Sequence, residues 1–184
     1  MDDHLREPVV LLDADGAVVG TMDKLSAHQR ATRHLAFSVV LYDADGAMVL
    51  QRRADAKHHF AGRWSNACCS HPRPGEPVVS AGRRRVREEL GVDCGDLSVQ
   101  GAFWYHARDP VSELVEHEYD VVLVGPVDAP LDPDPAEVAA IDRMRPAALR
   151  AALTADPQRF TPWLPQVVDL ALAPPTPVPP AILG

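Results

Sequence analysis

The sequence predicts an α+β fold, an α/β/α sandwich built on a mixed sheet with antiparallel hairpins. Two apolar runs, each interrupted by an Asp/Gly turn, at residues 9–19 and 38–50, are typical of β-hairpins. A helical segment follows at residues 77–90, and two more strands are expected near 98–106 and 116–124. Strands on both sides of a helix, combined with hairpins, favour helices packed against a sheet.

The two hairpins share the tetrapeptide Asp-Ala-Asp-Gly, at residues 13–16 and 43–46. Two copies indicate a shared turn chemistry and not a repeat architecture. Residues 54–75 have no periodicity and are interpreted as a long functional loop. In the central helix, Pro77 suits the first turn and Gly91 the C-terminal stop. Further helices are expected near residues 135–142, 146–154 and 162–172.

Composition excludes several classes of protein. The 184 residues carry a net charge of −8, which argues against sequence-independent nucleic-acid binding. No apolar run approaches the roughly 20 residues that span a bilayer, and the acidic N-terminus lacks the apolar core of a signal peptide. Three cysteines, two of them adjacent, make a poor disulfide framework. We therefore expect a cytoplasmic protein with free thiols that does not associate with membranes.

Two short segments carry chemistry. Cys69 lies two residues from His71, and Glu116 and Glu118 would share one face of a strand because side chains alternate along it. His28 and His34 flank the entry into an earlier strand. Three imidazoles and two carboxylates make a plausible octahedral metal site beside a thiol, which points to an enzyme.

Structural interpretations of the same residues remain open. Cys68 and Cys94 are typical small core residues, and zinc ligation by Cys68, Cys69 and His71 lacks the usual cysteine spacing. His58 and His59 are expected to be exposed loop residues and not ligands. Tyr105 and Trp163 are as compatible with packing in the core as with a role in a site. The charged pairs of the 77–90 helix are compatible with a solvated surface.

The helix and its flanks resemble the Nudix box, through Glu76, Arg84 and Glu88-Glu89-x-Gly91. Further motifs extend the resemblance along nearly the whole chain, to the type I isopentenyl-diphosphate isomerases: Lys24…His28…His34-Leu35-Ala36-Phe37-Ser38, Arg52-Arg53-Ala54…Lys57, Gly62-x-Trp64-x-Asn66-x-x-Cys69-x-His71-Pro72, Glu89-Leu90-Gly91, Tyr105, Glu116-x-Glu118 and Thr161-Pro162-Trp163. Three departures from the pattern stand out: Ser70 and Arg85 replace a glycine and a glutamate, and His28 and His34 are one residue closer together.

The resemblance implies a Nudix-like catalytic domain over residues 1–173, followed by a proline-rich tail at 174–184, which we expect to be extended and solvated. It also implies a role for each matching residue. One divalent metal (Mg²⁺, Mn²⁺ or Zn²⁺) would be bound by His28, His34, His71, Glu116 and Glu118. The catalytic residues would be Cys69 and Glu118, with Tyr105 and Trp163 beside them. Glu89 would help to hold Mg²⁺ on the substrate diphosphate. The phosphates would be contacted by Lys24, Arg53, Lys57 and Arg85.

The activity that the resemblance implies is conversion of isopentenyl diphosphate to dimethylallyl diphosphate through a tertiary carbocation, with Trp163 and Trp64 offering π faces to the cation. Three alternatives remain: a Nudix pyrophosphohydrolase, which Arg85 in place of a box glutamate disfavours, a cyclase that protonates a longer prenyl diphosphate, and a binding module without catalysis. The expected partner is a small prenyl diphosphate, and the expected state is a monomer or weak homodimer.

Overall fold

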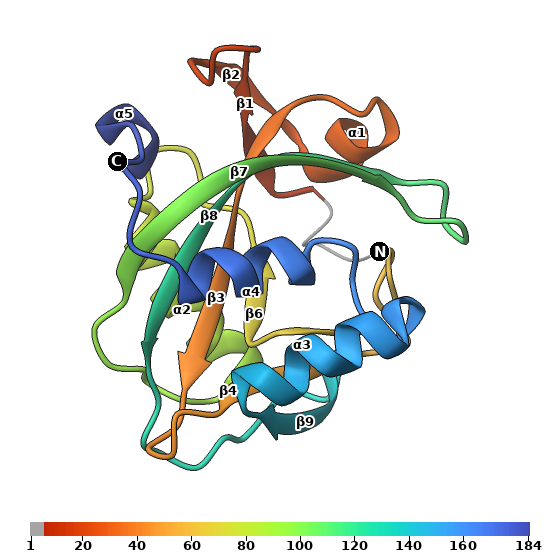
Figure 1. Cartoon of the computed structure of the whole chain (residues 1–184). Coiled ribbons are helices and arrows are strands. Elements are labelled where there is room, and N and C mark those ends of the chain that lie inside the picture. Colours follow the sequence, from red (N-terminus) through yellow and green to blue (C-terminus); the bar gives the residue numbers. More distant parts are fainter. Residues whose placement is uncertain (1–5) are drawn as a thin grey trace.

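The computed structural model describes residues 6–184, which fold around one large mixed sheet (Figure 1). Its strands are β1 (Pro8–Leu12), β2 (Val18–Asp23), β3 (His34–Tyr42), β4 (Met48–Arg53), β5 (Trp64–Asn66), β6 (Cys68–Ser70), β7 (Ser98–Arg108), β8 (Val115–Pro126) and β9 (Val138–Met144). The helices are α1 (Lys24–Gln29), α2 (Val78–Leu90), α3 (Pro146–Ala155), α4 (Leu164–Leu172) and α5 (Pro180–Leu183).

Strand β3 organises the sheet. It pairs antiparallel with β1, β4 and β6 and parallel with β8, while β7 and β8 form a long antiparallel pair. The register brings distant residues into line: His34 lies opposite Glu118, which in turn lies opposite Tyr105. In the same way Ser38 lies opposite Cys69. Strand pairing alone therefore brings these five polar side chains into a small area.

Helices cover both faces of the sheet, so the predicted α/β/α sandwich is confirmed. In Figure 1, α4 crosses in front of β3, β7 and β8, and α2 lies behind them. Alternate residues of β3 pack against the two helical layers, because successive side chains of a strand point to opposite faces of the sheet. Phe37 and Val39 pack with Val86 and Leu90 of α2, while Val40 packs on the α4 side.

The central helix begins and ends close to the predicted bounds. Pro77 precedes its first residue, and Gly91 ends it with a φ of +64°, in the left-handed region that favours glycine. A Cβ at position 91 would also lie 2.3 Å from the Asp132 carbonyl oxygen. This close approach holds the chain that leads to β9 against the C-terminal end of α2.

Two sequence-based assignments are wrong. Residues 138–144 form strand β9 and not part of a helix, because they pair with β4 and extend the sheet. Within residues 54–75, the expected loop contains the three-residue strands β5 and β6. Strands this short give no periodic signal in the sequence. In the structure the irregular chain is limited to residues 54–63 and 71–77.

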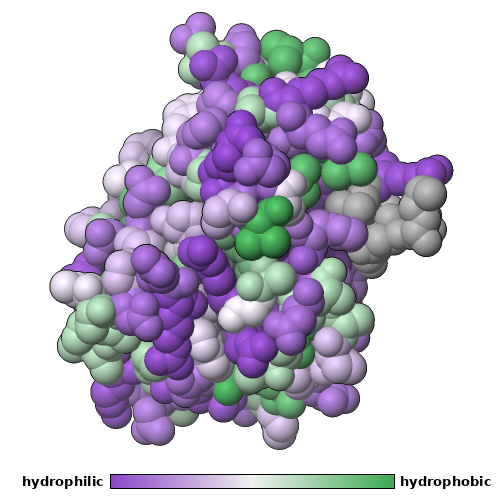
Figure 2. Space-filling view, turned by 90° about the vertical axis from the view of Figure 1, so that its right-hand side faces the viewer, coloured by the Kyte–Doolittle hydropathy of each residue, from purple (hydrophilic) through white to green (hydrophobic). Residues whose placement is uncertain are grey.

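The C-terminal tail packs against the protein. Val178 and Ile182 are buried in the same core as α2, and residues 180–183 form the short helix α5. The expectation of a solvated tail is therefore wrong for Val178 and Ile182, because prolines restrict the backbone without preventing the apolar residues between them from packing, whereas residues 174–177 are exposed as expected. The face in Figure 2 is mostly hydrophilic, with its hydrophobic residues in small separate patches. In residues 6–184 no helix has the length and apolar character to cross a membrane.

Candidate active site

A cavity of about 340 Å³ opens on the face of the sheet that carries Ser38, Glu118 and Asp120. Its walls come from α1, β3, β6, β7, β8 and the 54–63 loop. Most of the residues to which sequence analysis gives a role line it: Lys24, Arg53, Lys57, Cys69, His71, Arg85, Tyr105, Glu116, Glu118 and Trp163. His28, His34 and Glu89 are buried just beneath it, 1%, 0% and 1% exposed.

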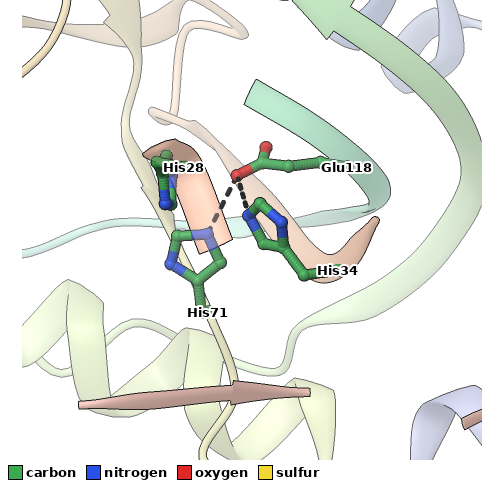
Figure 3. Close-up of side chains that lie close together, drawn as sticks. All are labelled: His28, His34, His71 and Glu118. Carbon is green, nitrogen blue, oxygen red and sulfur yellow. Dashed lines mark hydrogen bonds and ion pairs between the residues drawn. The ribbon is translucent and has the colours of Figure 1, made fainter. Parts of the chain in front are cut away.

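Three histidines converge on Glu118 beneath the cavity (Figure 3). Glu118 Oε1 lies 2.9 Å from His71 Nε2 and 3.3 Å from His34 Nε2. His28 stands beside them, with its ring centroid 4.8 Å from that of His34. The residues come from α1, β3, the segment after β6, and β8, so the fold assembles a cluster that sequence spacing alone could only suggest.

The protonation of these rings suits a cation. His28 Nδ1 lies 2.7 Å from the Lys24 carbonyl oxygen and His34 Nδ1 lies 2.7 Å from that of Thr32. A carbonyl can only accept, so each Nδ1 carries a proton, and in the neutral ring Nε2 presents a lone pair. Both Nε2 atoms are buried without a hydrogen-bond partner although carboxylate oxygens lie close by. A lone pair facing a carboxylate is unfavourable unless a proton or a metal ion lies between them. Burial would lower the pKa of His28, but Glu116 raises it, so the carboxylates favour positive charge here and these residues fit a divalent metal.

Glu116 lies beside the cluster of histidines and Glu118, and it contacts His59, a residue that sequence analysis did not expect to be a ligand. Its Oε2 lies 3.0 Å from His28 Nε2, and its Oε1 lies 2.7 Å from His59 Nε2. The prediction that His59 is exposed is wrong, because it is 9% exposed and lies against the metal-ligand candidates. Burial lowers the pKa of His59 to about 4, so its imidazole is neutral at pH 7.

Cys69 lies on the cavity wall with its sulfur surrounded by polar groups. The thiol donates to Asn66 Oδ1 at 3.0 Å, and Trp163 Nε1–H donates to the sulfur at 3.1 Å. Burial and the nearby Asp120 raise the pKa of Cys69 to about 11. The group is therefore a neutral thiol at pH 7. Cys68, its neighbour, points into the opposite core and is completely buried.

Tyr105 and Glu118 form a pair on the adjoining wall. The Tyr105 hydroxyl donates to Glu118 Oε2 at 2.5 Å, across the β7–β8 register. Burial and the charge of Glu116 raise the pKa of Glu118, and burial raises that of Tyr105 well above its ordinary range. Tyr105 therefore stays protonated, and its hydroxyl fixes one carboxylate oxygen of Glu118 while the other faces the histidines.

Asp120 is a third carboxyl on this face. It continues the alternation of Glu116 and Glu118 along β8, which is the signal that could have identified it. The Ser38 hydroxyl donates to Asp120 Oδ2 at 2.7 Å and lies 3.5 Å from the Cys69 sulfur. Burial and the charge of Glu118 raise the pKa of Asp120 well above its usual range. A chain of neighbouring polar groups thus joins the thiol to β8.

The other end of the cavity is cationic. Burial lowers the pKa of Lys57 to about 8 although Glu89 opposes the shift, and Lys57 pairs with Glu137. Burial also lowers the pKa of Lys24, in part against Glu116. The Arg53 guanidinium lies 5.7 Å from the centroid of the Trp163 ring. These positive groups make the cavity suitable for a phosphorylated ligand.

Arg85 and Glu89 close that end from α2. Arg85 pairs with Glu88, Glu89 and Glu137, and Gln51 donates to Glu89 at 3.0 Å. The Arg85–Glu89 pair is therefore buried. Arg84 is more exposed and binds Glu76 at 2.8 Å, more closely than it binds Glu88 at 3.3 Å.

Comparison with known proteins identifies the family to which this chain belongs. The NUDIX domain model matches residues 32–164. An isopentenyl-diphosphate Delta-isomerase from Nocardia farcinica is 47% identical over 165 residues, 89% of this chain and 94% of the relative. Another, from Halorhodospira halophila, is 45% identical over 166 residues with the same coverage of both chains. The chain belongs to the family of isopentenyl-diphosphate Delta-isomerases, within the NUDIX-domain proteins.

Solved structures share the fold at lower identity. The Deinococcus radiodurans protein DR0079 superposes with a TM-score of 0.74 at 20% identity, covering 91% of this chain and all of that one. A MutT protein from Methanosarcina mazei Go1 has a TM-score of 0.59 at 16% identity, over 74% of this chain and 91% of that one. These likenesses establish the Nudix fold and confirm the predicted architecture.

Within this isomerase-family chain, the structure brings together all the residues that sequence analysis selected, except Trp64. The Trp64 ring lies outside the cavity wall and 5.5 Å from the Arg159 guanidinium carbon. Trp163 lines the cavity and is 3% exposed. Four polar residues around the cluster had no assigned role in the sequence analysis: Ser38, His59, Asn66 and Asp120.

Proposed function

We propose that this protein isomerises isopentenyl diphosphate to dimethylallyl diphosphate. The observation that carries the proposal is the composition of one cavity: a neutral thiol and a Tyr–Glu pair at one end, and cationic side chains at the other. The relatives that share 45–47% of its residues have isopentenyl-diphosphate Delta-isomerase as their name.

The reaction moves a double bond by one position. A proton is added to the terminal carbon, the positive charge develops on the tertiary carbon, and a proton leaves the carbon next to it on the diphosphate side. Two proton-transfer groups are needed, and we assign them to Cys69 and Glu118. A positioned acid–base group contributes about 10²–10⁴ in rate. Tyr105 keeps Glu118 oriented through its short hydrogen bond.

The carbocation needs a dry site with a π face. Trp163 meets both requirements because it is nearly buried and lies on the cavity wall. Its ring centroid lies 5.9 Å from that of Tyr105 and 5.3 Å from that of Phe60. A cation over such a face gains about 0.5–2 kcal/mol. Its indole N–H also keeps the Cys69 sulfur in place.

The diphosphate would bind at the cationic end, where Lys24, Arg53, Lys57 and Arg85 meet. We assign Glu89 as a ligand of the Mg²⁺ that accompanies the diphosphate, because its buried carboxylate pairs with Arg85, which lines the cavity. This anchoring fixes the hydrocarbon between the two proton-transfer groups without taking part in the chemistry.

The His/Glu cluster would hold a divalent metal, Mg²⁺, Mn²⁺ or Zn²⁺. When bound, such an ion supplies positive charge that offsets the buried carboxylates Glu116 and Glu118. The Lys24 and Thr32 carbonyls orient His28 and His34. One oxygen of Glu118 remains hydrogen-bonded to Tyr105.

Arg85 argues against a pyrophosphohydrolase. It places a guanidinium among Glu88, Glu89 and Glu137, where it neutralises carboxylates that several metals would otherwise need. The cavity of about 340 Å³ lies at the small end of ligand sites, which favours a short prenyl chain over a long one that would be cyclised. A cytoplasmic location and a monomer or weak homodimer complete the proposal.

The test uses purified protein with Mg²⁺ and isopentenyl diphosphate in deuterated water, with products resolved by NMR. Dimethylallyl diphosphate with solvent deuterium in its methyl groups is the expected result, because the added proton exchanges with solvent through the protein. Release of phosphate would indicate hydrolysis, and a cyclic product from longer prenyl diphosphates would indicate cyclisation. Either result without isomerisation would overturn the proposal.

A further inference from the structure

Glu137 is a carboxylate at the cationic end of the cavity to which the proposed function gives no part. It lines the cavity together with Lys57 and Arg85 and pairs with both of them. Its Oε2 pairs with the Lys57 ammonium, and its Oε1 lies 3.2 Å from Arg85 Nη2. Two of the cations assigned to the diphosphate are therefore already paired with one negative charge.

Backbone hydrogen bonds hold Glu137 in place directly before β9. Its N–H donates to the Asp134 carbonyl, and its carbonyl accepts from the Ala54 N–H, both at 3.0 Å. The Asp134 N–H in turn donates at 3.0 Å to the carbonyl of Glu89, near the end of α2. The backbone at Glu137 is thus fixed between α2 and the 54–63 loop, and the two ion pairs direct its carboxylate toward the cationic end.

A phosphate bound at this end would lie close to the Glu137 carboxylate. A phosphate oxygen accepts a hydrogen bond from an ammonium at about 3 Å, so any oxygen that Lys57 binds lies within about 6 Å of Glu137 Oε2. This distance is shorter than the roughly 8–10 Å over which salt screens charges, and both side chains of the ion pair are largely buried. The carboxylate therefore repels a bound diphosphate in proportion to the negative charge that the ligand carries.

The charge of a diphosphate depends on Mg²⁺. An ionised diphosphate ester carries about three negative charges, whereas its Mg²⁺ complex carries about one. We propose that Glu137 selects the Mg²⁺ complex of the substrate, because its carboxylate repels the metal-free diphosphate more strongly than the complex. A repulsive group directed against the wrong ligand is a general source of specificity. The inference rests on the proposed function, which places the diphosphate beside Lys57 and Arg85.

Two other roles for Glu137 predict different results. If Glu137 only holds Lys57 in position, removing its charge weakens binding of both forms of the ligand. If Glu137 is itself a ligand of the Mg²⁺ that accompanies the diphosphate, removing its charge weakens binding of the Mg²⁺ complex. Repulsion alone predicts tighter binding of the metal-free diphosphate together with little change for the complex.

The experiment measures by calorimetry how inorganic pyrophosphate binds to the full chain, loaded with one equivalent of Zn²⁺, at pH 7 with and without Mg²⁺. Glu137→Gln keeps the size of the side chain and an oxygen that accepts from Lys57, but it removes the charge. We expect the affinity for metal-free pyrophosphate to rise at least about tenfold and that for the Mg²⁺ complex about twofold, because the repulsion scales with ligand charge. A rise of less than threefold for metal-free pyrophosphate, or an equal or larger change for the complex, would overturn the proposal.

Glu88→Gln is the matched control. Glu88 also pairs with Arg85, at 2.8 Å, but its side chain is 37% exposed and does not line the cavity, so both affinities should stay within threefold of the wild type. Glu137→Asp keeps the charge and should retain the preference for the Mg²⁺ complex, and near-UV circular dichroism checks that each variant folds. A wild type that binds pyrophosphate in neither form, or that makes no dimethylallyl diphosphate, would instead count against the proposed function. A wild type that isomerises, with both affinities unchanged in Glu137→Gln, would refute only the role of Glu137.

Discussion

The pKa values of acidic groups shift in opposite directions at the two ends of the cavity. At the end formed by β6, β7 and β8, burial and neighbouring carboxylates raise the pKa of Cys69 to about 11 and that of Asp120 well above its usual range. At the end formed by α2 and the 54–63 loop, Lys57 and Arg85 lower the pKa of Glu89 although burial alone would raise it. The thiol of Cys69 and the carboxyl of Asp120 are thus held neutral, whereas the carboxylate of Glu89 is held ionised.

The difference follows from the partners that each end supplies. Along β8, burial and the charge of Glu116 raise the pKa of Glu118, and burial and the charge of Glu118 raise that of Asp120, whereas His59 and His28 lower the pKa of Glu116 against the effect of burial. Glu89 of α2 faces cations and stays ionised. A neutral thiol suits a reaction that passes through a carbocation, because a thiolate beside the cation would capture it.

The largest effect should come from removing the thiol. Cys69→Ala takes away a proton-transfer group but leaves the cationic end unchanged, so kcat should fall by about 10²–10⁴ while KM changes little. Steady-state kinetics of the purified variant measure both. Cys68→Ala and Cys94→Ala are the controls, because Cys68 lies in the opposite core and Cys94 lies outside the cavity.

Cys69→Ser sharpens the same test. A hydroxyl is similar in size but far less acidic, so activity should remain well below that of the wild type. Wild-type activity in the serine or alanine variant would show that the thiol only fills space. Because the thiolate is the reactive form and the pKa of Cys69 is about 11, an alkylating reagent should inactivate the enzyme slowly at pH 7 and faster at higher pH, and substrate should protect it; modification of Cys94 alone on inactivation would contradict the assignment.

Glu118→Gln should lower kcat by at least about 10². The amide keeps the size of the side chain and can still contact Tyr105, but it loses the basic oxygen that faces His34 and His71. Metal content should fall with activity, and chelation of the wild type should abolish turnover until a divalent ion is added. Glu113→Gln is the matched control, since Glu113 pairs only with exposed Arg108 among the described contacts. Equal losses in both variants would mean that the carboxylates act through folding.

The sequence predicted which residues lie together at the cavity better than it predicted the secondary structure around them. Glu116 and Glu118 were placed on one face because a strand alternates with a period of two, and this rule holds wherever the strand lies. Residues 138–144 are rich in alanine and favour a helix locally, yet the open edge of β4 recruits them as β9. Tertiary pairing of this kind has no local signal.

His59 was missed for a similar reason. Nothing in the segment around it marks the residue as buried, because its position depends on Arg53 and on the backbone conformation at Phe60. The two hairpins make the same point in a different way. Their turns are nearly identical in sequence, but β2 is largely exposed, whereas β4 is buried between β3 and β9. Local sequence determines the conformation of the turn, whereas the packing of the rest of the chain determines whether the strand that follows it is buried.

At the cationic end, pH should alter substrate capture. Lys57 has a pKa of about 8 in the free protein, so it is protonated below that pH and loses its charge above it. By pH 9 only about a tenth of the molecules keep the ammonium, and kcat/KM should fall accordingly. Lys57→Arg, which stays charged, should remove this decline between pH 7 and 9.5. A decline that survives in Lys57→Arg would assign the titration to another group.

The smallest effect should come from Trp163→Phe, which tests whether the indole N–H positions the Cys69 thiol. Phenylalanine keeps an aromatic face toward Phe60 and Tyr105 but loses the indole N–H that donates to the Cys69 sulfur and to Ser65 Oγ, both at 3.1 Å. One such hydrogen bond contributes about 1 kcal/mol, so kcat should fall about fivefold with KM unchanged. Trp64→Phe should have no effect on kcat, because that ring lies outside the cavity wall. If Trp163→Phe raised KM and left kcat unchanged, Trp163 would instead serve substrate binding through its contact with Arg53.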